Sequence, residues 1–280
     1  MIDVVIPAHP KDFALLRHCI RGVLRNIAPL RQVVVVSSDH YTAREDRVKW
    51  VPETAAEQAG LPSLKEIESD WASRSLQPTP RATWIYQQLL KLGAGGYIED
   101  LSNRFLVVDA DVIFLRYVSF ADAERRILYS RASEYHPPYL EAYRRLTGED
   151  PPSRESFTAH HMLYDQNLLD ELFASIEGLK GEPWYWAYVH AADPAEASAI
   201  NEQDTFGLWM LSQHRERMRH RQLFWRDVSI TPRALGRAHL GLDYDFVAVH
   251  AYRKGPRLRR ARGLGLRLAR ELFPKRRAPG

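Results

Sequence analysis

Short apolar runs alternate with amphipathic stretches through the first 115 residues. The apolar runs have the length of buried strands and cover residues 2–6, 32–36, 48–51 and 105–108. The amphipathic stretches place apolar side chains at the spacing of a helix and cover residues 11–26 and 83–92. Strand, helix, strand, helix, strand is the order of an α/β domain with right-handed crossovers. We therefore expect a largely parallel sheet flanked by helices.

The second half of the chain has a weaker pattern. Helical spacing covers residues 117–135, 139–147, 167–176 and 203–213. A last apolar run at 246–250 predicts a short strand, whereas the polar stretch 63–71 is interpreted as surface. No internal repeat or low-complexity linker separates the two halves. We therefore expect one domain over residues 1–255.

Cysteine use and hydropathy restrict the class of protein. The chain of 280 residues has one cysteine, Cys19, so no disulfide can form within it, which fits a reducing compartment. Residues 2–6 form a strand at once, without the basic and apolar segments of a signal peptide. No run of about 18 apolar residues is present. We expect a cytoplasmic protein.

Basic residues are concentrated at the C-terminus. Residues 253–280 contain eleven Lys and Arg and one acid, while the rest of the chain has a net charge of −6. From Leu258 to Phe273 most apolar side chains fall on one side of a helix and most arginines on the other. Such a tail, residues 256–280, is expected to hold the protein at an anionic membrane surface, the inner face of the plasma membrane. The alternatives are a helix packed on the body and a disordered tail. Nucleic-acid binding is not expected, because no aromatic residue lies between the arginines.

Two carboxylates follow the apolar run 105–108. Asp109 and Asp111 flank one small residue, and four apolar residues come next. A carboxylate that is buried alone loses most of its hydration. Mg²⁺ or Mn²⁺ removes that penalty, and sites for these ions combine one or two carboxylates with substrate phosphates. We expect a divalent-metal site here, with a solvated turn as the alternative.

Polar residues also follow two other predicted strands. His9 follows the first strand and Asp39 the second. Ligands of parallel sheets bind beyond the carboxyl ends of the strands. We therefore expect His9, Asp39 and Asp109 to line one crevice.

Three segments occur together in one order. They are Ile-Pro-Ala-His-Pro-Lys-Asp at 6–12, Trp-Ile-Tyr-Gln-Gln-Leu-Leu-Lys-Leu at 84–92 and Val-Val-Asp-Ala-Asp at 107–111. This combination resembles the nucleotide-sugar-dependent glycosyltransferases of the GT-A fold, and looks closest to a poorly characterised bacterial family. That family has Ser-Glu-Tyr-Glu-Thr-Tyr-Gly late in the chain. Here Asn-Glu-Gln-Asp-Thr-Phe-Gly at 201–207 keeps both acidic positions, the Thr and the Gly.

The resemblance covers about residues 2–255 and implies a fold and an activity. The fold is a GT-A-like, Rossmann-type α/β domain with a basic C-terminal tail, the nucleotide side at about 1–115 and the acceptor side at about 116–255. The activity is transfer of a sugar from a nucleoside diphosphate sugar, with UDP expected, to a glycan or lipid-linked acceptor in bacterial surface polysaccharide synthesis. Mn²⁺ or Mg²⁺ would stabilise the diphosphate leaving group.

The resemblance also implies roles for individual residues. The expected metal ligands are Asp109, Asp111 and His250, where Asp109 would contact the metal, the ribose or both. The base and ribose would lie against Pro7, Ala8, His9 and Asp39. The expected donor-facing and phosphate-binding side chains are Arg81, Gln88, Lys91 and Lys254. The acids near the acceptor hydroxyl would be Glu202 and Asp204.

Each of these residues also has a plain structural interpretation. His250 could be a core histidine, and Gln88 with Lys91 could simply face water. Glu202 and Asp204 could complement a helix dipole. Adjacent His160 and His161 point to different sides of a strand or loop, which makes joint chelation of one metal difficult, and one of them could contact the sugar or the acceptor.

Three other functions compete with sugar transfer. An aspartyl-phosphate phosphatase would use Asp109 as its nucleophile, but that class places the motif in its first strand. A sugar nucleotidyltransferase would open with a Gly-rich phosphate loop, and residues 7–12 contain no Gly. A non-catalytic carbohydrate-binding protein would use the aromatic cluster at 184–188 and would not need the carboxylates.

Overall fold

The computed structural model describes residues 1–74, 82–193, 195–196, 198–229 and 243–250. Arg81, Lys254 and the tail 256–280 lie outside the described residues, and the roles expected of them stay predictions. Among the described residues, the helices are too short or too polar to cross a bilayer.

Five strands form the main sheet in the order β3-β2-β1-β4-β7. The strands are β1 (Ile2–Pro7), β2 (Leu30–Ser37), β3 (Val48–Pro52), β4 (Arg104–Val108) and β7 (His161–Asp165). The first four run parallel, and β7 pairs antiparallel with β4. Both faces of the central strands β1 and β4 are buried, as in sheets covered by helices on two sides. The prediction of a mainly parallel sheet is confirmed.

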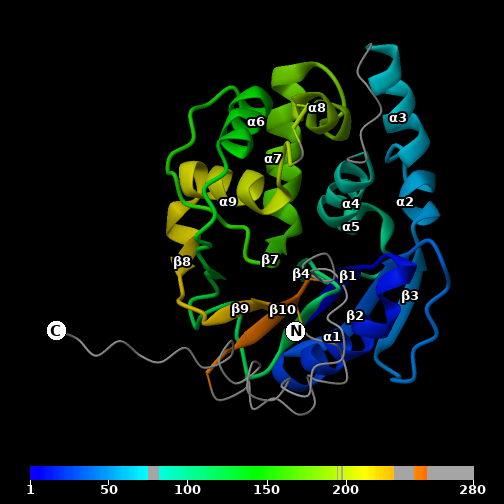
Figure 1. The fold of residues 1–280 in the computed structure, drawn as a ribbon. Helices are drawn as coiled ribbons and strands as arrows, with labels where there is room; N and C mark the ends of the chain where they lie inside the picture. The colour runs from blue at the N-terminus through cyan, green and yellow to red at the C-terminus, as the bar shows by residue number, and fades with distance from the viewer. Residues whose placement is uncertain (75–81, 194, 197, 230–242, 251–280) are drawn as a thin grey trace, which may run out of the picture.

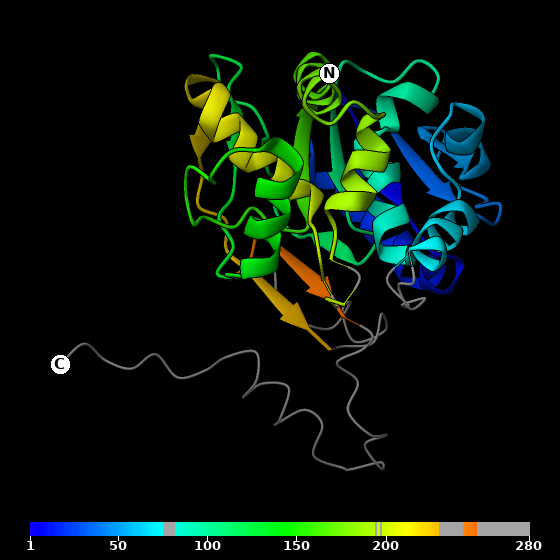
Figure 2. The ribbon, with the colours of Figure 1, turned by 90° about the horizontal axis from the view of Figure 1, so that it is seen from above.

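Helices lie on both sides of this sheet (Figures 1 and 2). The first half contains η1 (Pro10–Asp12), α1 (Phe13–Asn26), α2 (Thr54–Gln58), α3 (Leu64–Ser73), α4 (Ala82–Leu92) and α5 (Ala94–Tyr97). The second half contains α6 (Pro137–Thr147), α7 (Gln166–Lys180), α8 (Trp184–Ala191), α9 (Glu202–Gln213) and η2 (Arg215–Arg217). In Figure 1, α1 lies below the sheet, and α4, α7 and α9 lie above it.

Two small sheets complete the fold. The first has the order β5-β10-β9, with β5 (Val112–Phe114), β9 (Trp225–Val228) and β10 (Phe246–Val249). Strand β10 pairs antiparallel with β5 and parallel with β9. The second joins β6 (Ile127–Tyr129) and β8 (Met218–His220) in parallel. Because β5 begins directly after Asp111, the first small sheet brings the end of the described chain to the carboxylate pair.

The prediction of a helix over residues 117–135 is wrong. This stretch contains β6 and irregular turns. The Leu128 N–H donates to the Phe120 carbonyl, and β6 pairs with β8, which is distant in the sequence. Pairing with β8 therefore makes residues 127–129 a strand, although the local spacing of apolar residues predicts a helix.

Most of residues 63–71, interpreted from the sequence as polar surface, form the surface helix α3. The helix begins with a capping box in which Ser63 Oγ accepts from the Glu66 N–H and the Glu66 carboxylate accepts from the Ser63 N–H. Ile67 and Trp71 bury one face of the helix. The stretch is thus amphipathic, with few apolar positions.

Candidate functional site

A cavity of about 1800 Å³ lies at the carboxyl ends of the main-sheet strands. Pro7, Ala8 and His9 line it after β1, and Asp109 and Asp111 line it after β4. The prediction that His9 and Asp109 share one crevice is confirmed. After β2 the cavity is lined by Ser38 and not by Asp39, which is exposed. The chain turns there, because Ser37 Oγ donates to the Asp39 carbonyl, and this corrects the expectation for Asp39.

Five side chains form a continuous acid–histidine cluster in this cavity. His250 lies 3.2 Å from Asp111 and 3.3 Å from Asp227, measured from ring nitrogen to carboxylate oxygen. His160 lies 3.4 Å from Asp109 and 3.5 Å from the same Asp227 oxygen. Polar contacts thus link elements that are distant in the sequence, in the order Asp111, His250, Asp227, His160 and Asp109.

The charges in the acid–histidine cluster depend on one another. The pKa of His250 is raised to about 9 by hydrogen bonds with Asp111 and Asp227. Burial lowers the pKa of His160, but hydrogen bonds with Asp109 and Asp227 outweigh it and raise that pKa to about 10. The pKa of Asp227 is held far below its usual value by hydrogen bonds from both histidines. Two imidazolium groups therefore partly balance three carboxylates.

The donor atoms of the acid–histidine cluster fit a divalent cation. Ligand atoms of His160, Asp227 and His250 lie within 4.8 Å of one another, and so do those of Asp109, Asp111 and His160. A cation between them would replace the imidazolium charge and would use neutral ring nitrogens. Carboxylate oxygens suit Mg²⁺ and Mn²⁺, whereas imidazole favours transition-metal ions.

Lys91 connects this cluster to the protein interior. Its Nζ lies 2.7 Å from Asp109 Oδ1 and 2.8 Å from Glu202 Oε1, and its side chain is 3 % exposed. Burial works against the charge of Lys91, but the two carboxylates raise its pKa above the usual value. Burial raises the pKa of Asp109, whereas Lys91 and His160 outweigh it and hold that pKa well below its usual value. Lys91 therefore reaches the cavity wall from a buried position, and its charge is matched by Asp109 and Glu202.

Gln88 is fully buried and is not among the residues that line the cavity. Its Oε1 accepts from the Glu202 N–H at 2.8 Å, which ties α4 to the first turn of α9. Gln88 therefore faces neither the donor cavity nor water. The neighbouring Gln87 lines the cavity instead.

Glu202 and Asp204 are buried in the first turn of α9. Asp204 accepts hydrogen bonds from the Phe157 N–H at 2.5 Å and from Ser156 Oγ. Burial raises the pKa of Asp204 to about 7. Neither acid is among the cavity-lining residues, whereas their neighbours Asn201 and Gln203 are. The Glu202 and Asp204 side chains therefore have no direct access to the cavity, which their expected role near the acceptor hydroxyl requires.

The acid–histidine cluster includes two ligand candidates that sequence reasoning did not assign to it, His160 and Asp227. His160 has φ of +63°, and its carbonyl accepts from the Asp109 N–H. His161 points away, into a buried group of aromatic rings that includes Phe120, so the two histidines do diverge. The His-His pair was a visible signal for His160. No sequence signal pointed to Asp227, because it reaches the cluster only through the pairing of β9 with β10.

Comparisons with known proteins give one family and several distant structures. Residues 27–220 match the model of a family of unknown function, DUF6492. No curated protein matches the chain. Among solved structures, the galactosyltransferase LgtC in complex with donor and acceptor sugar analogues is similar at 14% identity, with a TM-score of 0.48, over 99% of this chain and 98% of that chain. Apo mouse xyloside xylosyltransferase 1 is similar at 12% identity, with the same TM-score, over 91% of this chain and 100% of that chain.

The structural likenesses are too distant to carry an argument about this chain. The family match is different, because it spans well over half of the sequence. The chain therefore belongs to the DUF6492 family.

Proposed function

We propose that this protein is a metal-dependent glycosyltransferase that moves a sugar from a nucleoside diphosphate sugar to a glycan or lipid-linked acceptor. The observation that carries the proposal is the acid–histidine cluster at the carboxyl edge of a parallel sheet, inside a cavity of about 1800 Å³. Ligands of open α/β sheets bind at this edge. The cavity is larger than a drug-sized ligand needs, which leaves room for a donor and an acceptor.

The strand order supports a placement for the nucleotide. Strand β1 lies between β4, which is followed by Asp109, and β2, which is followed by Ser38. Neighbouring strands are about 4.8 Å apart, so the edge from β4 to β2 is about 10 Å long. A diphosphate at the acid–histidine cluster would place ribose and base along Pro7, Ala8 and His9. UDP is the first nucleotide to test, because of the sequence resemblance.

The cluster would act on the leaving group. Asp109, Asp111, Asp227, His160 and His250 are the side chains that would hold a divalent ion, with Mn²⁺ or Mg²⁺ as the ions to test. That ion would neutralise charge on the departing diphosphate. Lys91 keeps the Asp109 carboxylate in place with a 2.7 Å contact. An ordered Asp109 loses less entropy when it binds the donor.

The acceptor side offers a different carboxylate from those predicted. Glu134, Tyr139 and Asn201 line the cavity there, whereas Glu202 and Asp204 lie behind the wall. A general base must come within hydrogen-bond reach of the proton that it accepts. Glu134 therefore fits this role better than either buried acid.

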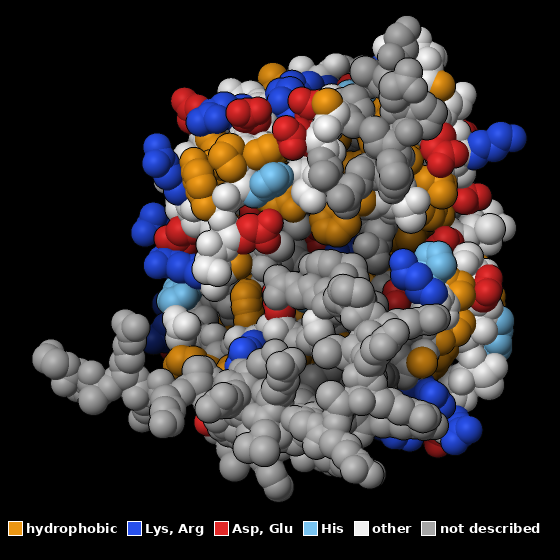
Figure 3. Space-filling view, viewed as in Figure 1, with side chains coloured by type: hydrophobic (Ala, Val, Ile, Leu, Met, Phe, Trp, Pro, Cys, Tyr) orange, Lys and Arg blue, Asp and Glu red, His pale blue; other side chains and the backbone are white. Residues whose placement is uncertain are grey.

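The charge distribution of the body favours a small anionic donor over a nucleic acid. Acidic and basic side chains are interspersed on the face shown in Figure 3, without a continuous basic stripe among its described residues. Membrane docking by residues 256–280 remains a proposal from sequence alone. It predicts that a 1–255 chain binds anionic vesicles less than the full chain does.

The rival functions have less support. Residues 184–188 begin α8, and the Trp184 ring stacks on Phe173 with 3.9 Å between centroids. Tyr188 is buried. Trp184, Tyr185 and Trp186 are half-buried against the core, which reduces the ring surface that a bound carbohydrate could cover. An Asp109 nucleophile would have to break its contacts with Lys91 and His160.

Donor binding is tested by thermal shift with UDP, GDP, CDP and ADP, each with Mn²⁺ and with EDTA. A ligand at a hundred times its Kd stabilises the folded state by about 2.7 kcal/mol. We expect one nucleotide to stabilise the protein only with Mn²⁺. Asp111→Asn should lose that shift and nearly all turnover of the matching nucleotide sugar, while the exposed control Asp46→Asn keeps both. Turnover in EDTA, or in Asp111→Asn, contradicts the proposal. Hydrolysis of p-nitrophenyl phosphate without nucleotide binding favours the phosphatase.

A further inference from the structure

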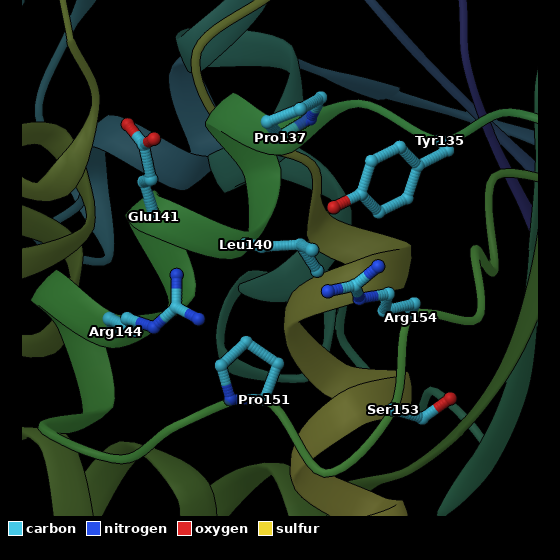
Figure 4. A pocket seen from close by; sticks show the side chains of 8 residues that line it. All are labelled: Tyr135, Pro137, Leu140, Glu141, Arg144, Pro151, Ser153 and Arg154. Carbon is cyan, nitrogen blue, oxygen red and sulfur yellow. The ribbon is translucent and has the colours of Figure 1, made fainter.

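A second, smaller cavity of about 250 Å³ lies beside the start of α6. Figure 4 shows its lining side chains, which come from the segment before α6, from α6 itself and from the segment after it. Nothing in the proposed transfer reaction uses this pocket. Its chemistry differs from that of the acid–histidine cluster, because its charged groups that point inward are arginines.

Two guanidinium groups flank the small pocket. Arg144 and Arg154 point toward each other across Leu140 in Figure 4, whereas the Glu141 carboxylate points away. Arg144 Nε donates to Asp150 Oδ1 at 2.6 Å, which leaves its terminal nitrogens for the pocket. Arg154 is exposed and has no hydrogen bond or ion pair with another described residue. The pocket therefore presents N–H donors from two guanidinium groups, and Asp150 neutralises only that of Arg144.

The rest of the small pocket combines aromatic, aliphatic and polar side chains. Tyr135 is 53% exposed, and its hydroxyl points inward in Figure 4. Leu140 and Pro151 line the floor and the far side. An aromatic ring beside aliphatic groups suits the C–H face of a sugar ring, and a planar guanidinium fork matches a carboxylate or a phosphate.

The small pocket and the large cavity share one wall. Ser133 and Glu134 line the large cavity, and the next residue, Tyr135, lines the small pocket. The same change occurs inside α6, where Tyr139 faces the large cavity and Leu140 the small pocket. The two cavities therefore lie on either side of the same segment, within the reach of neighbouring residues, so a chain of sugars bound in the large cavity would end close to the small pocket.

We propose that the small pocket binds an anionic sugar unit of the acceptor, recognised through a carboxylate or a phosphate by Arg144 and Arg154. This inference rests on the proposed sugar transfer, which gives the neighbouring cavity its acceptor. The bound unit is not the one that receives the new sugar. It selects acceptors that carry negative charge a short distance from the reacting hydroxyl.

The test uses saturation-transfer NMR on the full chain with glucuronic acid, glucose 6-phosphate and glucose as probes. We expect signals from one or both anionic probes and none from glucose at the same concentration. A signal from glucuronic acid alone identifies a carboxylate ligand, and one from glucose 6-phosphate alone identifies a phosphate ligand. Equal signals from all three probes, or no signal from either anion, overturn the proposal.

Variants assign the signal to the pocket. Arg154→Gln should weaken binding of the anionic probe about tenfold, as expected when one charge-assisted hydrogen bond is lost. Arg25→Gln, at an exposed position of α1, should leave it unchanged. Unchanged probe binding in Arg154→Gln overturns the assignment. Arg154→Gln should keep the Mn²⁺-dependent nucleotide shift, so failure of this proposal is distinguishable from failure of the proposed transfer function.

Discussion

The two halves of the molecule are built in different ways. In the first half, β1, β2 and β3 pair in parallel with strands nearby in the sequence, and only β4 reaches back over a long separation, to β1. From Asp109 onward, most strands pair with a strand that is distant in the sequence: β5 with β10, β6 with β8, and β7 with β4, while β9 pairs with the nearer β10. The first half is a scaffold of local units, whereas the second half depends on long-range contacts for its shape.

The candidate chemistry lies where the two halves meet. Asp109 and Asp111 end the scaffold, and His160, Asp227 and His250 come from three separate places in the second half. Lys91 of α4 contacts Glu202 of α9 across the same boundary. We therefore predict that a substitution at this boundary lowers the free energy of unfolding more than a substitution within a local element does.

The largest effect is expected for Lys91→Met. It leaves the Glu202 carboxylate buried without its counter-charge and removes one of the two cationic neighbours of Asp109, and breaking a buried ion pair in this way costs about 3–5 kcal/mol. Urea unfolding in EDTA measures the change in the free energy of unfolding. Lys65→Met, at an exposed position of α3, is the control. Adding Glu202→Gln to Lys91→Met should restore part of the stability. If Lys91→Met unfolds with the same free energy as Lys65→Met, the Lys91 contacts do not stabilise the boundary between the halves.

Gly207→Ala tests close packing in the second half. A Cβ at Gly207 would lie 2.4 Å from the ring of buried Phe157. We expect a loss of about 2–3 kcal/mol, because overpacking displaces side chains and backbone. Gly178→Ala in α7 meets open space and should stabilise the protein by up to about 1 kcal/mol. Equal melting temperatures of the two variants would argue against this packing.

Asp204→Asn tests a buried acid by pH. The folded pKa of Asp204 is about 7, against an ordinary value of 3.8. As the pH rises from about 4 to 7, the unfolded chain releases this proton while the folded protein keeps it, so the wild type loses stability. Asn is neutral throughout. The variant should therefore gain on the order of 3 kcal/mol relative to the wild type across this range. A melting-temperature difference that is independent of pH rules out the raised pKa.

Ser63→Ala tests a local device of the first half. It removes the capping box at the start of α3 and should cost about 1 kcal/mol. Nucleotide binding should be unchanged, because the box lies outside the acid–histidine cluster. Lys65→Ala in the same helix serves as the control for thermal unfolding. A loss of Mn²⁺-dependent nucleotide binding in Ser63→Ala would show that the two halves are not as separate as the contacts indicate.

The clearest error in secondary-structure prediction lies in the second half. Residues 2–6, 32–36 and 83–92 have strong periodicity, and each forms the predicted element. Residues 117–135 have helical spacing but form β6 and turns, because β8 offers strand pairing. Periodicity reports which face of a segment is apolar, and it does not report which partner that face will meet.

Sequence alone determined the α/β scaffold and the place of Asp109 and Asp111, because strand ends and apolar runs are local properties. It also indicated His250 at the end of the last apolar run. Only the tertiary structure decided that His160 and Asp227 join them, that Lys91 and Glu202 pair in the interior, and that Gln88 ties two helices together. The physical reason is that a side chain's charge partners are set by contacts between distant segments. Those contacts form only when the buried surfaces of both halves come together.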